Sequence, residues 1–254
     1  MGDICAIHTN TLSSVYTDST IKSKQSSQLL FGELCIIKSE RNNFCYIESN
    51  IDSYCGWVHK DVFAPLSPIE YERLKDRATA QICLPLAQAI DVEKGEMLHL
   101  PAGSFAHDYN AKDNSFYIAK RRYQVFPDTV TYCPYGQLGA LESIALSFIG
   151  APLMDGGKSI LGIDTGGYIQ LIFSLCGFRT PRGCQEQLQM GVPVYSTEQL
   201  RMGDVIFIVA HDMVEQSFVY LGDNRIINVQ EKVKITELSK IENLTSSVVI
   251  RRLV

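Results

Sequence analysis

The residue types that could do nucleophilic or metal chemistry are spread along the chain and form no compact motif. No two of the eight cysteines form a Cys-x-x-Cys pair: Cys5, Cys35, Cys45, Cys55, Cys83, Cys133, Cys176 and Cys184. Without such a pair, neither a zinc ribbon nor a thioredoxin-type redox site is indicated. A chain of this length can build its own cores without a disulfide framework. We therefore expect most of these thiols to be free and buried, where a thiol behaves as a small hydrophobic group.

The histidines and glycines also lack a diagnostic spacing. Four of the five histidines follow no recurring metal-ligand interval: His8, His59, His99 and His107. Gly156-Gly157 is not followed by the Lys-Ser/Thr pattern of a phosphate-binding loop. The sequence thus predicts neither a metal site nor a cofactor.

Composition limits the class of protein. The 254 residues are 46% hydrophobic and 20% charged, which suits two or three small domains with cores and not a disordered chain. Lys and Arg total 23 against 28 for Asp and Glu, a net charge of −5, so nothing attracts the whole chain to nucleic acid or anionic lipid. The basic run 120–122 is typical of a solvated strand end. No apolar run approaches the roughly 18 residues that span a bilayer, so we expect no membrane span.

The first ten residues bear on location. They lack the charged start and apolar core of a signal peptide. On the sequence shown, a cytoplasmic location is expected. A periplasmic or cell-envelope location would follow if a leader has been removed.

The first 65 residues are typical of a small β-barrel. Strands are expected near 32–38, 43–48 and 56–59, with turn residues between them. Trp57 falls on the last of these strands, where a core position and a groove position are both open. The Pro-Leu-Ser-Pro break at 65–68 follows, and Ser67 can cap a short helix over 69–77.

The rest of the chain changes from strands to helices and back. A second strand-rich stretch includes 95–100, 116–119 and 123–126. Apolar residues then recur at helical spacing over 138–149 and again over 168–176. Three strand candidates follow at 204–210, 217–221 and 225–230. Helices followed by strands predict an α+β layer and argue against a doubly wound parallel sheet.

Five blocks between residues 150 and 229 occur in the order of a known family. They are GAPLMDGG (150–157), GIDTGGY (162–168), Pro181-Arg182 with Gln187, LRMGDVIF (200–207) and VYLG (219–222). This order resembles the NlpC-type papain-like peptidases, which cut bacterial cell-wall peptides. The preceding β units look like the paired bacterial SH3-like domains of the YkfC-like subgroup. Those enzymes are γ-D-glutamyl-L-diamino-acid endopeptidases that act on murein peptides with a free N-terminal L-Ala.

The resemblance implies an α+β protein in four parts. An SH3-like β-barrel is expected at 1–65 and a helical linker at 66–79. A second SH3-like β unit is expected at 80–132, and a papain-like NlpC-type domain at 133–254.

The family's chemistry uses a Cys at the start of a helix, where free N–H groups and the helix dipole stabilise the thiolate. A strand-borne His removes the proton, and a third polar residue orients that His. By the resemblance these positions fall on Thr165, Gln216 and Asn228. The family tolerates Asn in the third position, but the nucleophile and the base are both absent. A degenerate catalytic centre is therefore predicted, with Thr165 or Asp164 capping the helix instead.

Two departures concern the groove. The family's Trp-Gly-Gly is replaced by a segment that begins at Asp155, and the Asp after Pro-Arg, which holds the substrate's free amine, is replaced by Gly183. The Ser beside that Asp is Cys184 here. The substrate-groove candidates are Asp155, Asp164, Gly183 and Cys184. Because an ammonium buried without a counter-charge is costly, a bound peptide need not present a free L-Ala amine, and classical murein fragments should bind weakly.

The resulting interpretation is a pseudoenzyme that binds a murein-derived peptide or a protein partner between its domains. An active hydrolase with a relocated nucleophile remains open, with Cys184 and His211 as the candidate pair. A paired-carboxylate site at Asp155 and Asp164 also remains open, as does a purely structural module. An open polar groove would favour peptide binding, and a filled one would favour interaction through outer surfaces.

Overall fold

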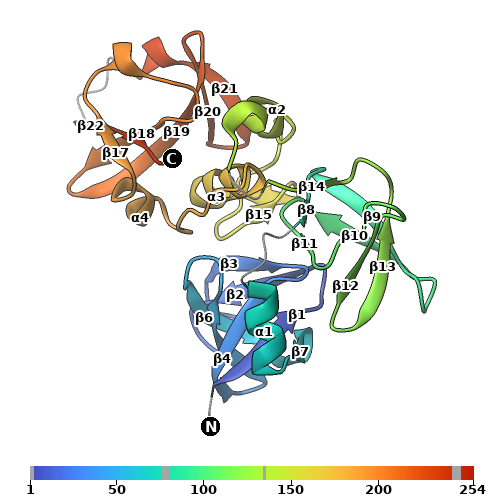
Figure 1. Ribbon diagram of the computed structural model, residues 1–254. Helices are drawn as coiled ribbons and strands as arrows, with labels where there is room; N and C mark the ends of the chain where they lie inside the picture. The colour runs from blue at the N-terminus through green and yellow to red at the C-terminus, as the bar shows by residue number, and fades with distance from the viewer. Residues whose placement is uncertain (1–2, 76–79, 134–135, 242–246) are drawn as a thin grey trace.

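The computed structural model describes residues 3–75, 80–133, 136–241 and 247–254. Two β-rich units, blue and green in Figure 1, lie against a yellow-to-red unit of helices and strands. The helix α3 (Thr165–Leu175) lies close to where the three units meet. This α+β arrangement confirms the predicted fold class.

The first unit is one antiparallel sheet with strand order β3-β2-β6-β5-β4-β1-β7. Its strands are β1 (Ile4–His8), β2 (Leu12–Tyr16), β3 (Gln25–Leu30), β4 (Leu34–Arg41), β5 (Phe44–Ser49), β6 (Cys55–His59) and β7 (Phe63–Pro65). Asn42 and Asn43 both have positive φ, which fits the tight turn between β4 and β5. Trp57 is half-buried on the surface of this unit, with the Arg41 guanidinium 4.8 Å above its ring.

The helix α1 (Pro68–Lys75) begins as predicted, because Ser67 Oγ accepts the Glu70 N–H at 3.2 Å. The last two residues of the predicted helix, 76–77, lie outside the described residues.

The second β unit contains two small sheets, ordered β10-β9-β13-β12 and β11-β8-β14. Its strands are β8 (Ala80–Ile82), β9 (Leu86–Asp91), β10 (Met97–Pro101), β11 (Phe105–Ala106), β12 (Ser115–Ile118), β13 (Arg121–Val125) and β14 (Val130–Thr131). Phe31 of the first unit packs edge-on against Tyr123 of the second, with ring centroids 5.1 Å apart. The two β units therefore share a hydrophobic core.

The last unit is a six-stranded antiparallel sheet, β17-β22-β18-β19-β20-β21, with α3 against one face. The strands are β17 (Val192–Val194), β18 (Val205–Ala210), β19 (Met213–Gly222), β20 (Arg225–Val229), β21 (Val233–Glu237) and β22 (Ser247–Arg252); β15 (Lys158–Ser159) and β16 (Gly162–Ile163) form a separate hairpin. The predicted helix over 138–149 is shorter: a 3₁₀ turn at Leu138–Ala140 leads into α2 (Leu141–Leu146). A further short helix, α4 (Cys184–Leu188), follows α3.

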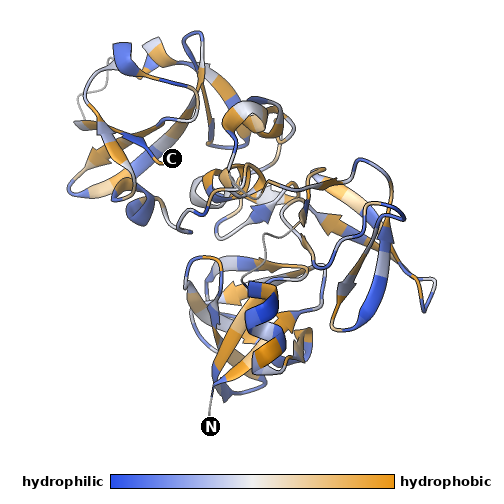
Figure 2. Cartoon of the chain, in the orientation of Figure 1, coloured by the Kyte–Doolittle hydropathy of each residue, from blue (hydrophilic) through white to orange (hydrophobic). Residues whose placement is uncertain are grey.

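Figure 2 shows hydrophobic residues distributed over the strands and along α3. Among the described residues, no helix combines the length and apolar character needed to cross a membrane.

Candidate functional site

The start of α3 is held by its own cap and by the sheet. Asp164 is the N-cap, and its Oδ1 accepts the Gly167 N–H at 2.7 Å. Of the two capping residues predicted, Asp164 and Thr165, the structure therefore has Asp164. Thr165, the first helical residue, donates its hydroxyl to the Val229 carbonyl at the end of β20, 3.1 Å away. The Thr165 hydroxyl proton is thus committed to a main-chain oxygen.

Asp164 is also the partner of a buried arginine. The two Arg182 Nη atoms each donate to one Asp164 oxygen at 2.8 Å, and Arg182 Nε donates to Ser27 Oγ of the first β unit at 3.0 Å. Asp164 Oδ2 accepts the Gly156 N–H as well. Asp155, in contrast, is exposed and 3.6 Å from Lys24 Nζ. The two carboxylates serve different partners, so the structure gives no support to a paired-carboxylate site.

Gln216 and Ser217 are neighbours on strand β19 and face opposite sides of the sheet. Val219 and Leu221 pack in the core that contains α3, whereas Phe218 and Tyr220 pack on the other face. Because side chains alternate along a strand, Ser217 lies on the α3 face and Gln216 on the opposite face.

Asn228, the third position given by the resemblance, lies on the same face of the sheet as Gln216. Asn228 follows Ile227, which packs on the α3 face, so its own side chain lies on the other face. Asn228 is buried, and its Oδ1 has no hydrogen-bond partner among the described residues.

This facing differs from the one expected for a base that acts on the residue at the start of α3. Gln216 pairs with Ile208 in the same unbroken register that joins Ser217 to Phe207, and the irregularity in the β18–β19 pairing comes only after it, where Val209 pairs with Val214. Plain alternation along β19 therefore sets the facing of Gln216, and an error of one residue in counting along the motif is enough to choose the wrong face.

Cys184 begins α4 close to the first turn of α3. Gln187 of α4 donates to the Gly166 carbonyl at 3.0 Å, which holds the two helices together. Burial raises the pKa of the Cys184 thiol, and the neighbouring Ser217 hydroxyl and Arg182 guanidinium oppose that rise only in part. The thiol is therefore protonated at neutral pH, unlike an activated nucleophile.

His211 lies in the exposed turn between β18 and β19. The Gln185 side chain of α4 joins this turn, since it donates to the Asp212 carbonyl and accepts the Val214 N–H. No hydrogen bond joins Cys184 to His211 in the described part of the chain. The Gln185 hydrogen bonds thus join the elements that carry the two residues.

The structure places a carboxylate beside Gly183, where the sequence motif has none. A Cβ atom at Gly183 would collide with Glu186 Oε2, so the Glu186 side chain reaches back over Gly183. Glu186 is exposed and forms no ion pair with another described residue. The sequence signal was its position three residues after the N-cap, from which a Glu side chain typically reaches back to the start of the helix.

The first β unit covers the turn at Asp155 and Gly156. Gln25 donates to the Asp155 carbonyl, and Gln28 accepts the Lys158 N–H. The buried Lys158 ammonium pairs with Glu33 at 2.7 Å. A cavity of only about 10 Å³ remains beside this pair, room for a single water at most. This small cavity lies inside the contact between the first β unit and the last unit, and none of Thr165, Asp155, Gly183 and Cys184 lines it.

In the described residues, no three His, Cys, Asp or Glu side chains converge to hold a metal ion. The two buried histidines instead bond to main-chain carbonyls: His8 to Leu30 and His107 to Gly32.

Two segments of the chain match known sequence families. Residues 150–252 match the NlpC/P60 family, and residues 15–62 match the bacterial dipeptidyl-peptidase Sh3 domain. The chain therefore carries an NlpC/P60 domain with a bacterial SH3 domain before it.

Among curated proteins, the chain is 23% identical over 243 residues to the gamma-D-glutamyl-L-lysine dipeptidyl-peptidase of Bacillus subtilis (strain 168). That match covers 87% of this chain and 76% of the relative. It is also 30% identical over 98 residues to a probable endopeptidase NlpC homolog of Haemophilus influenzae, covering 38% of this chain and 51% of that protein.

Two solved structures share the fold. An NlpC/P60 family protein from Bacillus cereus ATCC 10987 superposes with a TM-score of 0.82 at 18% identity, over 98% of this chain and 99% of that one. An NlpC/P60 endopeptidase from Photobacterium damselae subsp. piscicida gives 0.71 at 13% identity, over 96% of this chain and 70% of that one. The likeness extends over the β units as well as the NlpC/P60 domain.

Proposed function

We propose that this protein binds a cell-wall peptide without hydrolysing it, on the rim formed by the start of α3 and by α4. The observation that carries the proposal is the environment of Thr165. Its hydroxyl is bonded to the Val229 carbonyl, and no histidine in the described residues hydrogen-bonds to it. A neutral alcohol without a base is a poor nucleophile. In a serine peptidase, loss of the nucleophile or of the base costs on the order of 10⁶ in turnover.

The proposed ligand contains a γ-D-glutamyl-L-diamino-acid unit. The name of the Bacillus subtilis relative supports this class, because that protein is a gamma-D-glutamyl-L-lysine dipeptidyl-peptidase. The exposed Glu186 carboxylate beside Gly183 supports a ligand with a free amine, since a carboxylate there can neutralise an ammonium. The expectation drawn from Gly183 alone, that a free amine is not needed, is the alternative to this proposal.

Thermal stabilisation by the tripeptide L-Ala-γ-D-Glu-L-Lys tests the proposal, because a ligand of the native state raises apparent stability. We expect the γ-linked tripeptide to raise the melting temperature and its α-linked isomer to have no effect. Equal effects, or none from either peptide, would contradict specific peptide binding and leave a protein partner as the ligand.

A second candidate function is hydrolysis by Cys184. Its position beside Ser217 and the first turn of α3 favours this candidate, and the burial that raises its thiol pKa opposes it. Turnover that persists in Thr165→Ala and disappears in Cys184→Ala would establish it.

A further inference from the structure

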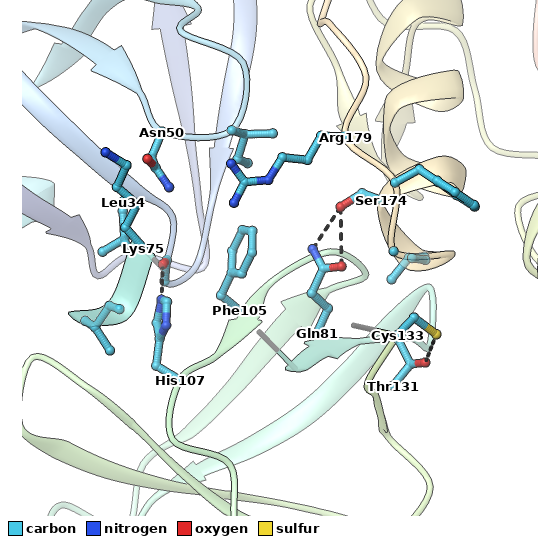
Figure 3. A pocket seen from close by; sticks show the side chains of 16 residues that line it. Leu34, Asn50, Lys75, Gln81, Phe105, His107, Thr131, Cys133, Ser174 and Arg179 are labelled. Carbon is cyan, nitrogen blue, oxygen red and sulfur yellow. Dashed lines mark hydrogen bonds between the residues drawn. The ribbon is translucent and has the colours of Figure 1, made fainter. Parts of the chain in front are cut away.

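A cavity of about 320 Å³ lies where the three units meet, near the C-terminal end of α3. The 11 residues of α3 separate it from Thr165 by roughly 15 Å along the helix. Its walls come from every unit: Asn50 from the first, Phe105 from the second, and Ser174 and Arg179 from the NlpC/P60 domain (Figure 3). Its volume lies at the lower end of the range of small-molecule sites, roughly 300–1,000 Å³.

The charge of the lining is one-sided. Among the described residues, it includes two cationic side chains, Lys75 and Arg179, and no carboxylate. Arg179 forms no ion pair or hydrogen bond with any described residue, and Figure 3 shows it extending toward Phe105. Lys75 Nζ lies 3.6 Å from an exposed carboxylate oxygen of Glu72. The Arg179 guanidinium is therefore available to an anion.

The third basic residue of the lining, His107, stays neutral. Burial lowers its pKa, and its Nε2 atom is 2.8 Å from the Gly32 carbonyl. Its ring instead stacks with Phe105, at 5.8 Å between centroids and 13° between planes. This stack fixes an aromatic wall beside the guanidinium.

The polar groups of the cavity are also held in place. Gln81 Nε2 donates to Ser174 Oγ at 3.0 Å, which bridges the second β unit and α3. Leu34 and Leu74 add apolar surface to the lining. A guanidinium that no described residue pairs with, an aromatic wall and a fixed amide thus surround one space.

We propose that this junction cavity binds a small organic carboxylate with an aromatic or similarly sized apolar body. The planar Arg179 guanidinium donates two parallel hydrogen bonds to the carboxylate, a geometry that arginine provides and lysine does not. The apolar body lies against Phe105. The site is independent of the function proposed for the start of α3, because none of its lining residues belongs to that rim.

Sodium benzoate is the test probe, with phenyl phosphate and neutral benzamide as matched probes, and binding is measured by ligand-observed NMR titration. We expect saturable binding of benzoate and at least tenfold weaker binding of benzamide. Arg179→Gln should weaken benzoate binding at least tenfold, the typical effect of losing a hydrogen bond to a charged group. Arg201→Gln, at an exposed arginine outside the lining, should leave the affinity unchanged.

A second variant tests the aromatic wall. Phe105→Leu should weaken benzoate binding while Thr165→Ala does not. Absence of saturable benzoate binding would overturn the proposal, as would an affinity that Arg179→Gln leaves unchanged. Binding of phenyl phosphate but not benzoate would overturn the carboxylate assignment.

Discussion

Arg182 and Asp164 face each other across two hydrogen bonds of 2.8 Å, with the arginine side chain 6% exposed. The same guanidinium reaches Ser27 of the first β unit, and the same carboxylate caps α3 and holds the turn at Gly156. One ion pair therefore fixes the start of α3, the neighbouring turn and the SH3 domain relative to one another.

Removal of this carboxylate should destabilise the protein strongly. Asp164→Ala leaves the Arg182 charge buried without a partner and removes the cap, so we expect the free energy of unfolding to fall by about 3 kcal/mol or more. Denaturant unfolding measures the loss. The control Asp155→Ala removes an exposed carboxylate and should cost less than about 1 kcal/mol. Equal losses in the two variants would contradict the structural role of the pair.

Stability should fall on acidification because of His8. Burial is the main reason that the pKa of His8 is lowered to about 4, from 6.5. Between these values the unfolded chain binds more protons than the native chain, so stability decreases as the pH falls through this window. The loss attributable to His8 approaches about 3 kcal/mol below pH 4.

Denaturant unfolding of His8→Gln at pH 7 and pH 4.5 checks this dependence. The variant should be less sensitive to pH than the wild type, while His99→Gln, at an exposed site, should behave like the wild type. An unchanged pH dependence in His8→Gln would rule out His8 as its source.

Introducing a thiol on α3 and an imidazole on β19 tests whether Ser217 or Gln216 faces α3. In Thr165→Cys, Ser217→His places the imidazole on the sheet face that α3 covers, and Gln216→His places it on the other face. An imidazolium near a thiol stabilises the thiolate. We expect the introduced thiol to be alkylated at least tenfold faster at pH 7 with Ser217→His than with Gln216→His.

Peptide mapping after iodoacetamide treatment separates this thiol from Cys184, and near-UV circular dichroism checks that both variants fold. Faster alkylation with Gln216→His would show that Gln216, and not Ser217, lies on the sheet face that α3 covers.

Glu186 should determine whether the protein prefers a peptide with a free amine over its N-acetylated form. We expect wild type to bind L-Ala-γ-D-Glu-L-Lys more tightly than its N-acetylated form, and Glu186→Gln to reduce that preference by about fivefold, as the loss of a partly exposed ion pair would. Calorimetry with both peptides measures the preference. Asp155→Ala is the matched control and should retain it. If Asp155→Ala removes the preference and Glu186→Gln does not, the amine pairs with Asp155.

Motif order made the fold predictable, because blocks that carry the resemblance coincide with the start of α3 and with parts of β18 and β19. Strands with clear apolar or aromatic content, such as β5, were also predictable. The polar strands β2 and β3 were not predictable, because their serines and glutamines give no alternation of apolar and polar residues. Their burial comes from contacts made by distant segments. The cap at Asp164 could be predicted from local chemistry.

The rest of the site depends on geometry that the sequence does not encode locally. The facing of Gln216 is set by the register of β19 in the folded sheet, and the fold-back of Glu186 places a carboxylate over Gly183. The link from Arg182 to Ser27 joins residues 155 positions apart, which no local pattern can reveal.

The central claim is that α3 begins with a hydroxyl that does no chemistry. Mass spectrometry of L-Ala-γ-D-Glu-L-Lys incubated with the purified protein tests it most directly, with Thr165→Ala and Cys184→Ala in parallel. We expect the peptide to remain intact in all three reactions, because neither a thiolate nor an imidazole base is available at the site. Release of L-Ala-D-Glu by the wild type that is lost in Thr165→Ala would contradict the account.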